Sequence, residues 1–63
     1  MFIKLTIEKD VFFYVNIFSI ESIYPLQGRG RSGSRVILTT SEENFLDVKE
    51  TPEEIMVLIE SLR

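Results

Sequence analysis

Glycine and arginine alternate in one short stretch of this 63-residue chain, and no other stretch has a clearer capacity for chemistry. Glycine lets successive backbone N–H groups turn toward an anion. The planar guanidinium of arginine pairs with two oxygens of a phosphate or carboxylate, and serine adds hydroxyl donors. The residues that we expect to contact an anionic ligand are Gly28, Arg29, Gly30, Arg31, Ser32, Gly33, Ser34 and Arg35.

The three glycines of this stretch match the spacing G-x-G-x-x-G. A dinucleotide-binding motif is excluded, because no helix is expected after it and the chain is too short for a doubly wound sheet. A protein-kinase glycine loop also lies between two strands, but a kinase needs metal ligands and a far larger body. The alternative to an anion site is a connecting loop that its arginines keep soluble.

The composition narrows the classes of function. The chain has no His, Cys or Trp, which excludes a disulfide framework, the usual zinc and haem sites, and Ser-His-Asp or Cys-His catalysis. The net charge is −3, with seven acidic residues and one lysine between Glu42 and Glu60. No pattern places two of these acids in a shared cleft. We therefore expect no enzyme, no cofactor, no metal and no nucleic-acid partner.

Hydrophobic periodicity predicts the elements that must hold the segment 28–35. Alternating or β-branched runs predict strands over 1–8, 11–16, 20–25, 35–40 and 44–48, with a tight turn at Lys9-Asp10 and another turn after Asn16. The predicted fold is mainly β within the α+β class. It is a single domain, 1–63, with a five-stranded antiparallel meander or small barrel and one C-terminal helix.

The start of that helix has several signals. Thr51 is a suitable cap, Pro52 suits the first helical position, and Glu54 completes a capping box. The inward stripe is expected to be Ile55, Leu58, Ile59 and Leu62.

Apolar side chains exceed what one small core can cover. The simplest interpretation of the aromatic set is packing in the core and sheet. The more specific alternative is that the aromatic rings stack against nucleic-acid bases. That set is Phe12, Phe13, Tyr14, Phe18 and Tyr24. A domain this short without metal or disulfide often needs a partner subunit. We predict a homo-oligomer with an interface formed by Phe2, Phe12, Tyr14, Met56 and Val57.

Several short stretches together suggest a family. They are Phe2-Ile3-Lys4-Leu5-Thr6, Asn16 followed by Ile20-Glu21-Ser22-Ile23, Val36-Ile37-Leu38-Thr39, and Val48-Lys49-Glu50-Thr51. In these the chain resembles the FlbD family of small bacterial proteins, which implies a link to flagellar and swarming motility. Similar short frames are found in phages. The chain departs from the family at Lys9-Asp10 and Ser41-Glu42-Glu43, where Asn-Gly-type turns are usual, and in its longer segment 28–34.

Two functions follow as hypotheses for a cytoplasmic protein without a membrane span, since the longest apolar run, 11–20, is about half a bilayer span. The first is a homo-oligomeric binding protein that holds or sequesters an anionic small molecule such as a nucleotide, as a phage anti-defence protein would. The alternative is a FlbD-like adaptor that contacts a protein partner in bacterial motility.

Overall fold

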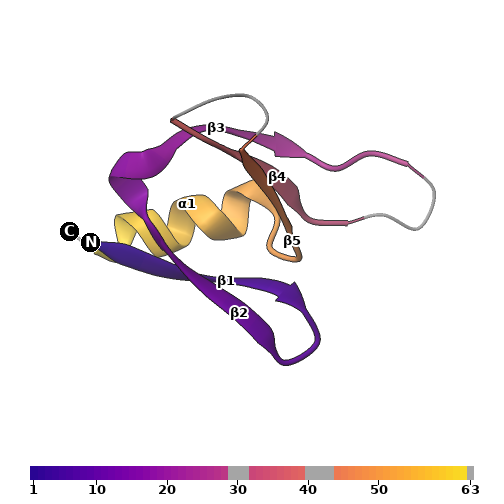
Figure 1. Ribbon diagram of the computed structural model, residues 1–63, viewed down its shortest axis with the longest axis horizontal. Helices are drawn as coiled ribbons and strands as arrows, with labels where there is room; N and C mark the ends of the chain where they lie inside the picture. Colours follow the sequence, from indigo (N-terminus) through magenta and orange to yellow (C-terminus); the bar gives the residue numbers. More distant parts are fainter. Residues whose placement is uncertain (29–31, 40–43, 63) are drawn as a thin grey trace.

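The strands form two antiparallel sheets, and one helix follows them. The computed structural model describes residues 1–28, 32–39 and 44–62. The elements in chain order are β1 (Phe2–Glu8), β2 (Val11–Asn16), the 3-10 helix η1 (Ile17–Ser19), β3 (Ile20–Pro25), β4 (Ser34–Leu38), β5 (Phe45–Val48) and α1 (Pro52–Glu60) (Figure 1). One sheet has the order β1-β2 and the other β3-β4-β5. The predicted mainly-β fold with a C-terminal helix is confirmed, as two open sheets and not as a closed barrel.

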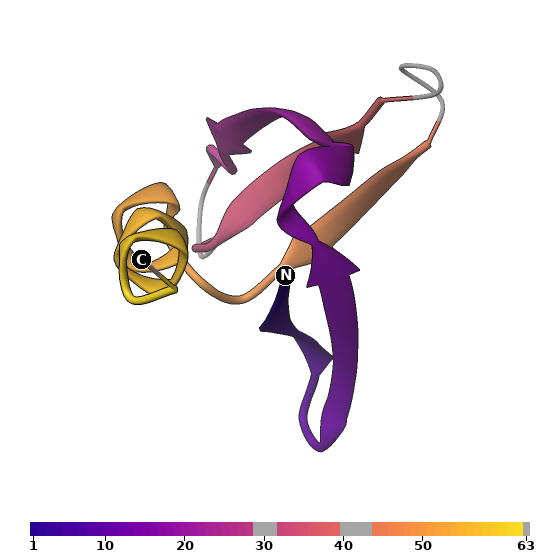
Figure 2. The ribbon, with the colours of Figure 1, turned by 90° about the vertical axis from the view of Figure 1, so that its left-hand side faces the viewer.

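The first sheet is the β1–β2 hairpin. Its register places Leu5 opposite Phe13 and Thr6 opposite Phe12, with an irregularity between Thr6 and Glu8. The predicted turn at Lys9 and Asp10 is confirmed, and Asp10 has a left-handed φ of 64°. The hairpin extends away from both the helix and the other sheet (Figure 2). The core still covers one face of β1, at Ile3, Leu5 and Ile7, whereas most of β2 is exposed.

The second sheet begins one residue earlier in β4 than predicted. β4 starts at Ser34, because Ser34 already pairs with Val48 of β5. The strand ends at Leu38. The predicted strand 20–25 is confirmed at both ends. The predicted strand 44–48 begins at Phe45 instead.

A buried apolar cluster joins both sheets to the helix. It consists of Ile3, Leu5, Val15, Val36, Val48 and Ile55. The predicted helical stripe is confirmed, because Ile55 is buried and Leu58, Ile59 and Leu62 pack against this cluster. No helix in the described part of the chain is long and apolar enough to cross a membrane.

Two helical caps follow from local sequence signals. The Thr51 hydroxyl accepts from the Glu54 backbone N–H at 3.2 Å, and the Glu54 carboxylate accepts from the Thr51 N–H at 3.0 Å. The predicted capping box is thus confirmed. The Asn16 side chain accepts from the Phe18 N–H at 3.1 Å and caps η1, at the turn predicted there.

Candidate interaction surface

The Gly–Arg segment is described at its two ends. Arg29, Gly30 and Arg31 lie outside the described residues, so their predicted ligand contacts remain a prediction. Gly28 and Ser32 are exposed on either side of them. Gly33 is buried at a φ of 103°, where a Cβ would clash with the carbonyl oxygen of Val48. The backbone of β4 approaches β5 so closely there that only glycine fits.

Ser34 and Arg35 have partners within the second sheet. The fully buried Ser34 hydroxyl donates to the Glu50 carbonyl oxygen at 2.8 Å. Arg35 Nε and Nη2 donate to the two carboxylate oxygens of Asp47 at 2.8 and 3.1 Å. The guanidinium also lies 4.2 Å from the ring centre of Phe45. The hydrogen bond to Asp47 raises the pKa of Arg35.

These contacts show that three of the predicted anion-binding residues have partners within the chain. Gly33 allows a close approach to Val48, Ser34 bonds to Glu50, and Arg35 pairs with Asp47. The sequence pattern shows arginine but does not show which acid lies opposite it. The register does, because it places Arg35 opposite Asp47.

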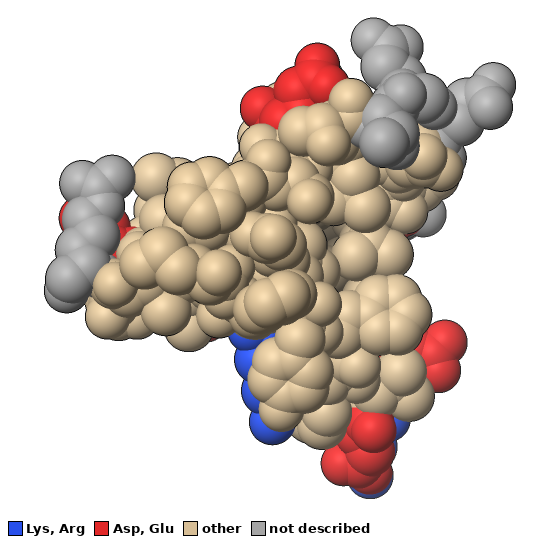
Figure 3. Space-filling model, turned by 60° about the vertical axis from the view of Figure 1, so that its left-hand side comes forward, with Lys and Arg blue, Asp and Glu red and all other residues tan. Residues whose placement is uncertain are grey.

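Large apolar side chains are exposed over much of the molecule. The exposed set among the described residues is Met1, Phe2, Val11, Phe12, Phe13, Tyr14, Phe18, Tyr24, Phe45, Met56 and Val57. All five residues predicted for the interface belong to it. Figure 3 shows uncharged side chains spread over one side of the molecule, with acidic groups at its margins and basic groups along its lower part. Exposed apolar side chains in such number are typical of a protein that contacts another protein.

The core interpretation of the aromatic residues is wrong. Tyr14 is 69% exposed, Phe18 is 74% exposed and Phe13 is 47% exposed. Phe13 is on the same face of the hairpin as the buried Val15 and lies opposite the fully buried Leu5, but it belongs to β2, which pairs on one side only among the described residues. Sequence reasoning therefore missed Phe13, Phe18 and Val11 as surface residues. Within the described part of the chain β2 pairs only with β1, and the sequence carries no signal for this.

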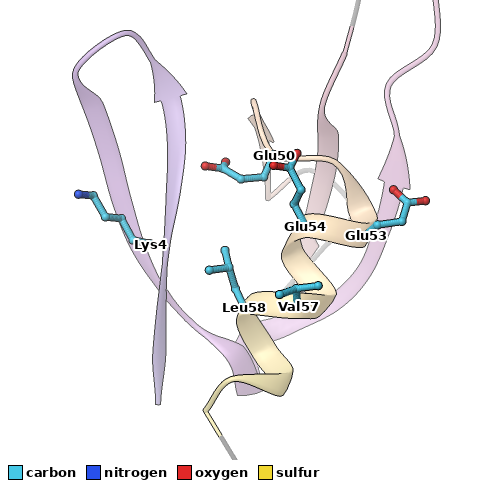
Figure 4. A pocket seen from close by; sticks show the side chains of 6 residues that line it. All are labelled: Lys4, Glu50, Glu53, Glu54, Val57 and Leu58. Carbon is cyan, nitrogen blue, oxygen red and sulfur yellow. The ribbon is translucent and has the colours of Figure 1, made fainter.

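A groove lies between β1 and the first turns of α1. It has a volume of about 570 Å³ and is lined by Lys4, Glu50, Glu53, Glu54, Val57 and Leu58 (Figure 4). The Lys4 amine is directed away from it and lies 4.1 Å from the ring centre of Phe12. Lys4 therefore covers part of the outer face of the hairpin instead of balancing the glutamates.

Two carboxylates of this groove, those of Glu50 and Glu54, bond to other parts of the fold. Glu50 accepts from the Thr6 backbone N–H at 2.8 Å and from the Thr6 hydroxyl at 2.7 Å. Glu54 caps α1 through its bond to Thr51. Among residues 1–28, 32–39 and 44–62, no three acidic, His or Cys side chains converge in a way that could hold a metal ion.

We find no match to this chain among protein-family models, curated proteins or solved structures.

Proposed function

We propose that this is a non-enzymatic binding protein that works through protein–protein contacts and associates with itself. The observation that carries the proposal is the exposure of aromatic side chains on both faces of the β1–β2 hairpin. Phe2 and Tyr14 are exposed on one face and Phe13 on the other. A two-stranded hairpin is marginally stable in water unless a third strand or another layer covers it.

Magnitudes favour association over a solvated surface. A buried aromatic side chain removes roughly 150–250 Å² from water, and each Å² of apolar surface contributes about 25 cal/mol. A stable interface covers about 800 Å² of each partner. The exposed rings of the hairpin supply a large part of such an area. A short domain also buries a smaller fraction of its own surface than a long one does, so a partner subunit adds stability.

The two hypotheses from the sequence differ in what supports them. An adaptor for a second protein uses the same exposed apolar surface, and the FlbD-like resemblance favours it. An anionic ligand depends on Arg29 and Arg31, because Arg35 already pairs with Asp47. Calorimetry against mono-, di- and cyclic nucleotides separates the two functions. Heat of binding that disappears in an Arg29→Lys, Arg31→Lys variant would support the anionic ligand.

Self-association is tested by measuring the mass of the full chain in solution at micromolar concentration. We expect at least a dimer of the 7.3 kDa chain. Tyr14→Glu and Val57→Glu should lower assembly and apparent stability together, because folding and association are linked. Gln27→Glu adds the same charge at an exposed polar position and should change neither. A folded monomer at every concentration would overturn the proposed self-association.

A further inference from the structure

The hairpin has an open backbone edge along β2. Thr6 is opposite Phe12, and its N–H and C=O are directed away from β2, since they bond to Glu50 and to the Lys49 N–H. Groups alternate along an antiparallel pair, so Phe12 and Tyr14 also direct their N–H and C=O away from β1. Within the described residues no strand pairs with that side of β2.

This edge lacks the features that usually prevent strand pairing. β2 reads Val-Phe-Phe-Tyr-Val-Asn, with no charged residue and no proline. β3, whose outer edge is also without a paired strand, contains Glu21 and Pro25. β5 is only four residues long and contains Asp47. Charge, proline and shortness are the common ways in which proteins block an edge, and β2 has none of them.

A second copy of β2 fits this edge in the antiparallel direction. With Phe13 opposite Phe13 of the second copy, Phe12 of each copy exchanges two backbone hydrogen bonds with Tyr14 of the other. The Phe13 rings then lie side by side on one face, and Phe12 lies beside Tyr14 on the other. The tip of each hairpin comes to lie beside the base of its partner, so Val11 is opposite Val15. No charged residue of β2 is brought against a like charge, because β2 has none.

We propose that two copies of this chain associate through the outer edges of their β2 strands, which joins the two hairpins into one four-stranded antiparallel sheet. This inference rests on the proposed self-association and names its surface and its geometry. It gives cross-strand neighbours to Val11, Phe12, Phe13 and Tyr14, none of which contributes to the monomer's buried core.

Cysteine cross-linking tests the geometry directly, because the chain contains no cysteine. Residues in a non-hydrogen-bonded antiparallel pair have Cα atoms about 4.5 Å apart, within the range that a disulfide spans. Phe13→Cys should form a covalent dimer under mild oxidation. Tyr24→Cys, at an exposed position of β3, is the matched control and should remain mostly monomeric. Equal cross-linking of the two variants would overturn the proposed pairing.

Proline at position 14 tests the backbone bonds. Tyr14→Pro removes the outward N–H and leaves the β1–β2 ladder intact, because the Tyr14 N–H faces the open edge. Tyr14→Thr removes the same ring but keeps the N–H. We expect the dissociation constant of the proline variant to exceed that of the threonine variant by roughly ten-fold or more, since each dimer loses two hydrogen bonds. Circular dichroism at high concentration checks that both variants fold.

The same mass measurements separate this inference from the proposed self-association. If the wild-type chain is a dimer and Tyr14→Pro leaves its dissociation constant at the level of Tyr14→Thr, self-association stands and the β2 edge is excluded. A wild-type chain that remains monomeric contradicts both.

Discussion

The β3–β4–β5 sheet and the β1–β2 hairpin are both built from largely apolar strands, yet their side chains find partners in different ways. In the sheet, Arg35 pairs with Asp47 and the Ser34 hydroxyl bonds to the Glu50 carbonyl. The polar side chains of β4 thus find partners within the same chain. In the hairpin, β2 exposes four consecutive large apolar residues, 11–14. One region is complete in the monomer, and the other presents a surface that a partner can cover.

A few polar groups connect the two regions. Thr6 bonds through its N–H and hydroxyl to the Glu50 carboxylate and through its carbonyl to the Lys49 N–H. Beyond Thr6 the hairpin continues to a turn with a left-handed Asp10. The difference teaches that the sheet adds side-chain bonds to its backbone ladders, whereas apolar contact and the bonds of Thr6 position the hairpin. Substitutions in the sheet should therefore unfold the chain, and those in the hairpin should alter association or local opening.

The largest effect is expected at the closest approach within the sheet. Gly33→Ala places a methyl group against the Val48 carbonyl oxygen at a φ of 103°. We expect a loss of about 3 kcal/mol or more in the free energy of unfolding, measured by urea denaturation at fixed protein concentration. Gly28→Ala is the control, because Gly28 also has a positive φ but is exposed. Similar losses in the two variants would mean that conformation, and not the close approach, requires glycine at 33.

The second effect concerns the connection between the regions. Glu50→Ala leaves the Thr6 N–H and hydroxyl without their acceptor, and we expect a loss of about 2 kcal/mol in the free energy of unfolding. Hydrogen exchange of the Thr6 amide should become faster than that of amides in β4. Glu53→Ala removes a neighbouring acid that is exposed on α1, with an expected change within about 0.5 kcal/mol. Unchanged Thr6 exchange in Glu50→Ala would show that apolar packing alone positions the hairpin.

The sequence predicts the elements well where the signals are local. The cap at Thr51, the turn after Asn16 and the strand 20–25 each depend on residues a few positions apart, and all three are confirmed. Partners distant in the sequence could not be predicted the same way. The pairing of Arg35 with Asp47 depends on the register of β4 against β5. The exposure of Phe13, opposite the buried Leu5, depends on which strand of the hairpin lies against the rest of the fold, and the sequence of β2 does not encode this.

A smaller effect is expected at the cap of α1, which packs against both regions. Thr51→Ala removes the acceptor of the Glu54 N–H and should cost about 1 kcal/mol in the free energy of unfolding. Glu54→Ala should cost less, because it removes only the reciprocal bond to the exposed end of the helix. Thr51→Ser keeps the hydroxyl and should retain most of the stability. If Thr51→Ala were neutral in thermal unfolding, the cap would not contribute to the stability of α1.

The smallest effect is expected at the tip of the hairpin. Asp10 has a φ of 64°, which an aspartate tolerates and a glycine adopts without strain. Asp10→Gly relieves backbone strain in the folded state but adds conformational freedom to the unfolded chain. We therefore expect a net change in the free energy of unfolding within about 0.5 kcal/mol. Asp10→Val places a β-branched residue in the same conformation and should cost about 1–2 kcal/mol. Because the tip is far from the β3–β4–β5 sheet, hydrogen exchange in Asp10→Val should become faster in residues 7–13 and stay unchanged in β4. Equal acceleration of exchange in β4 would show that the hairpin and the sheet unfold as one unit. The two regions would then differ in their amino-acid composition but not in their stability.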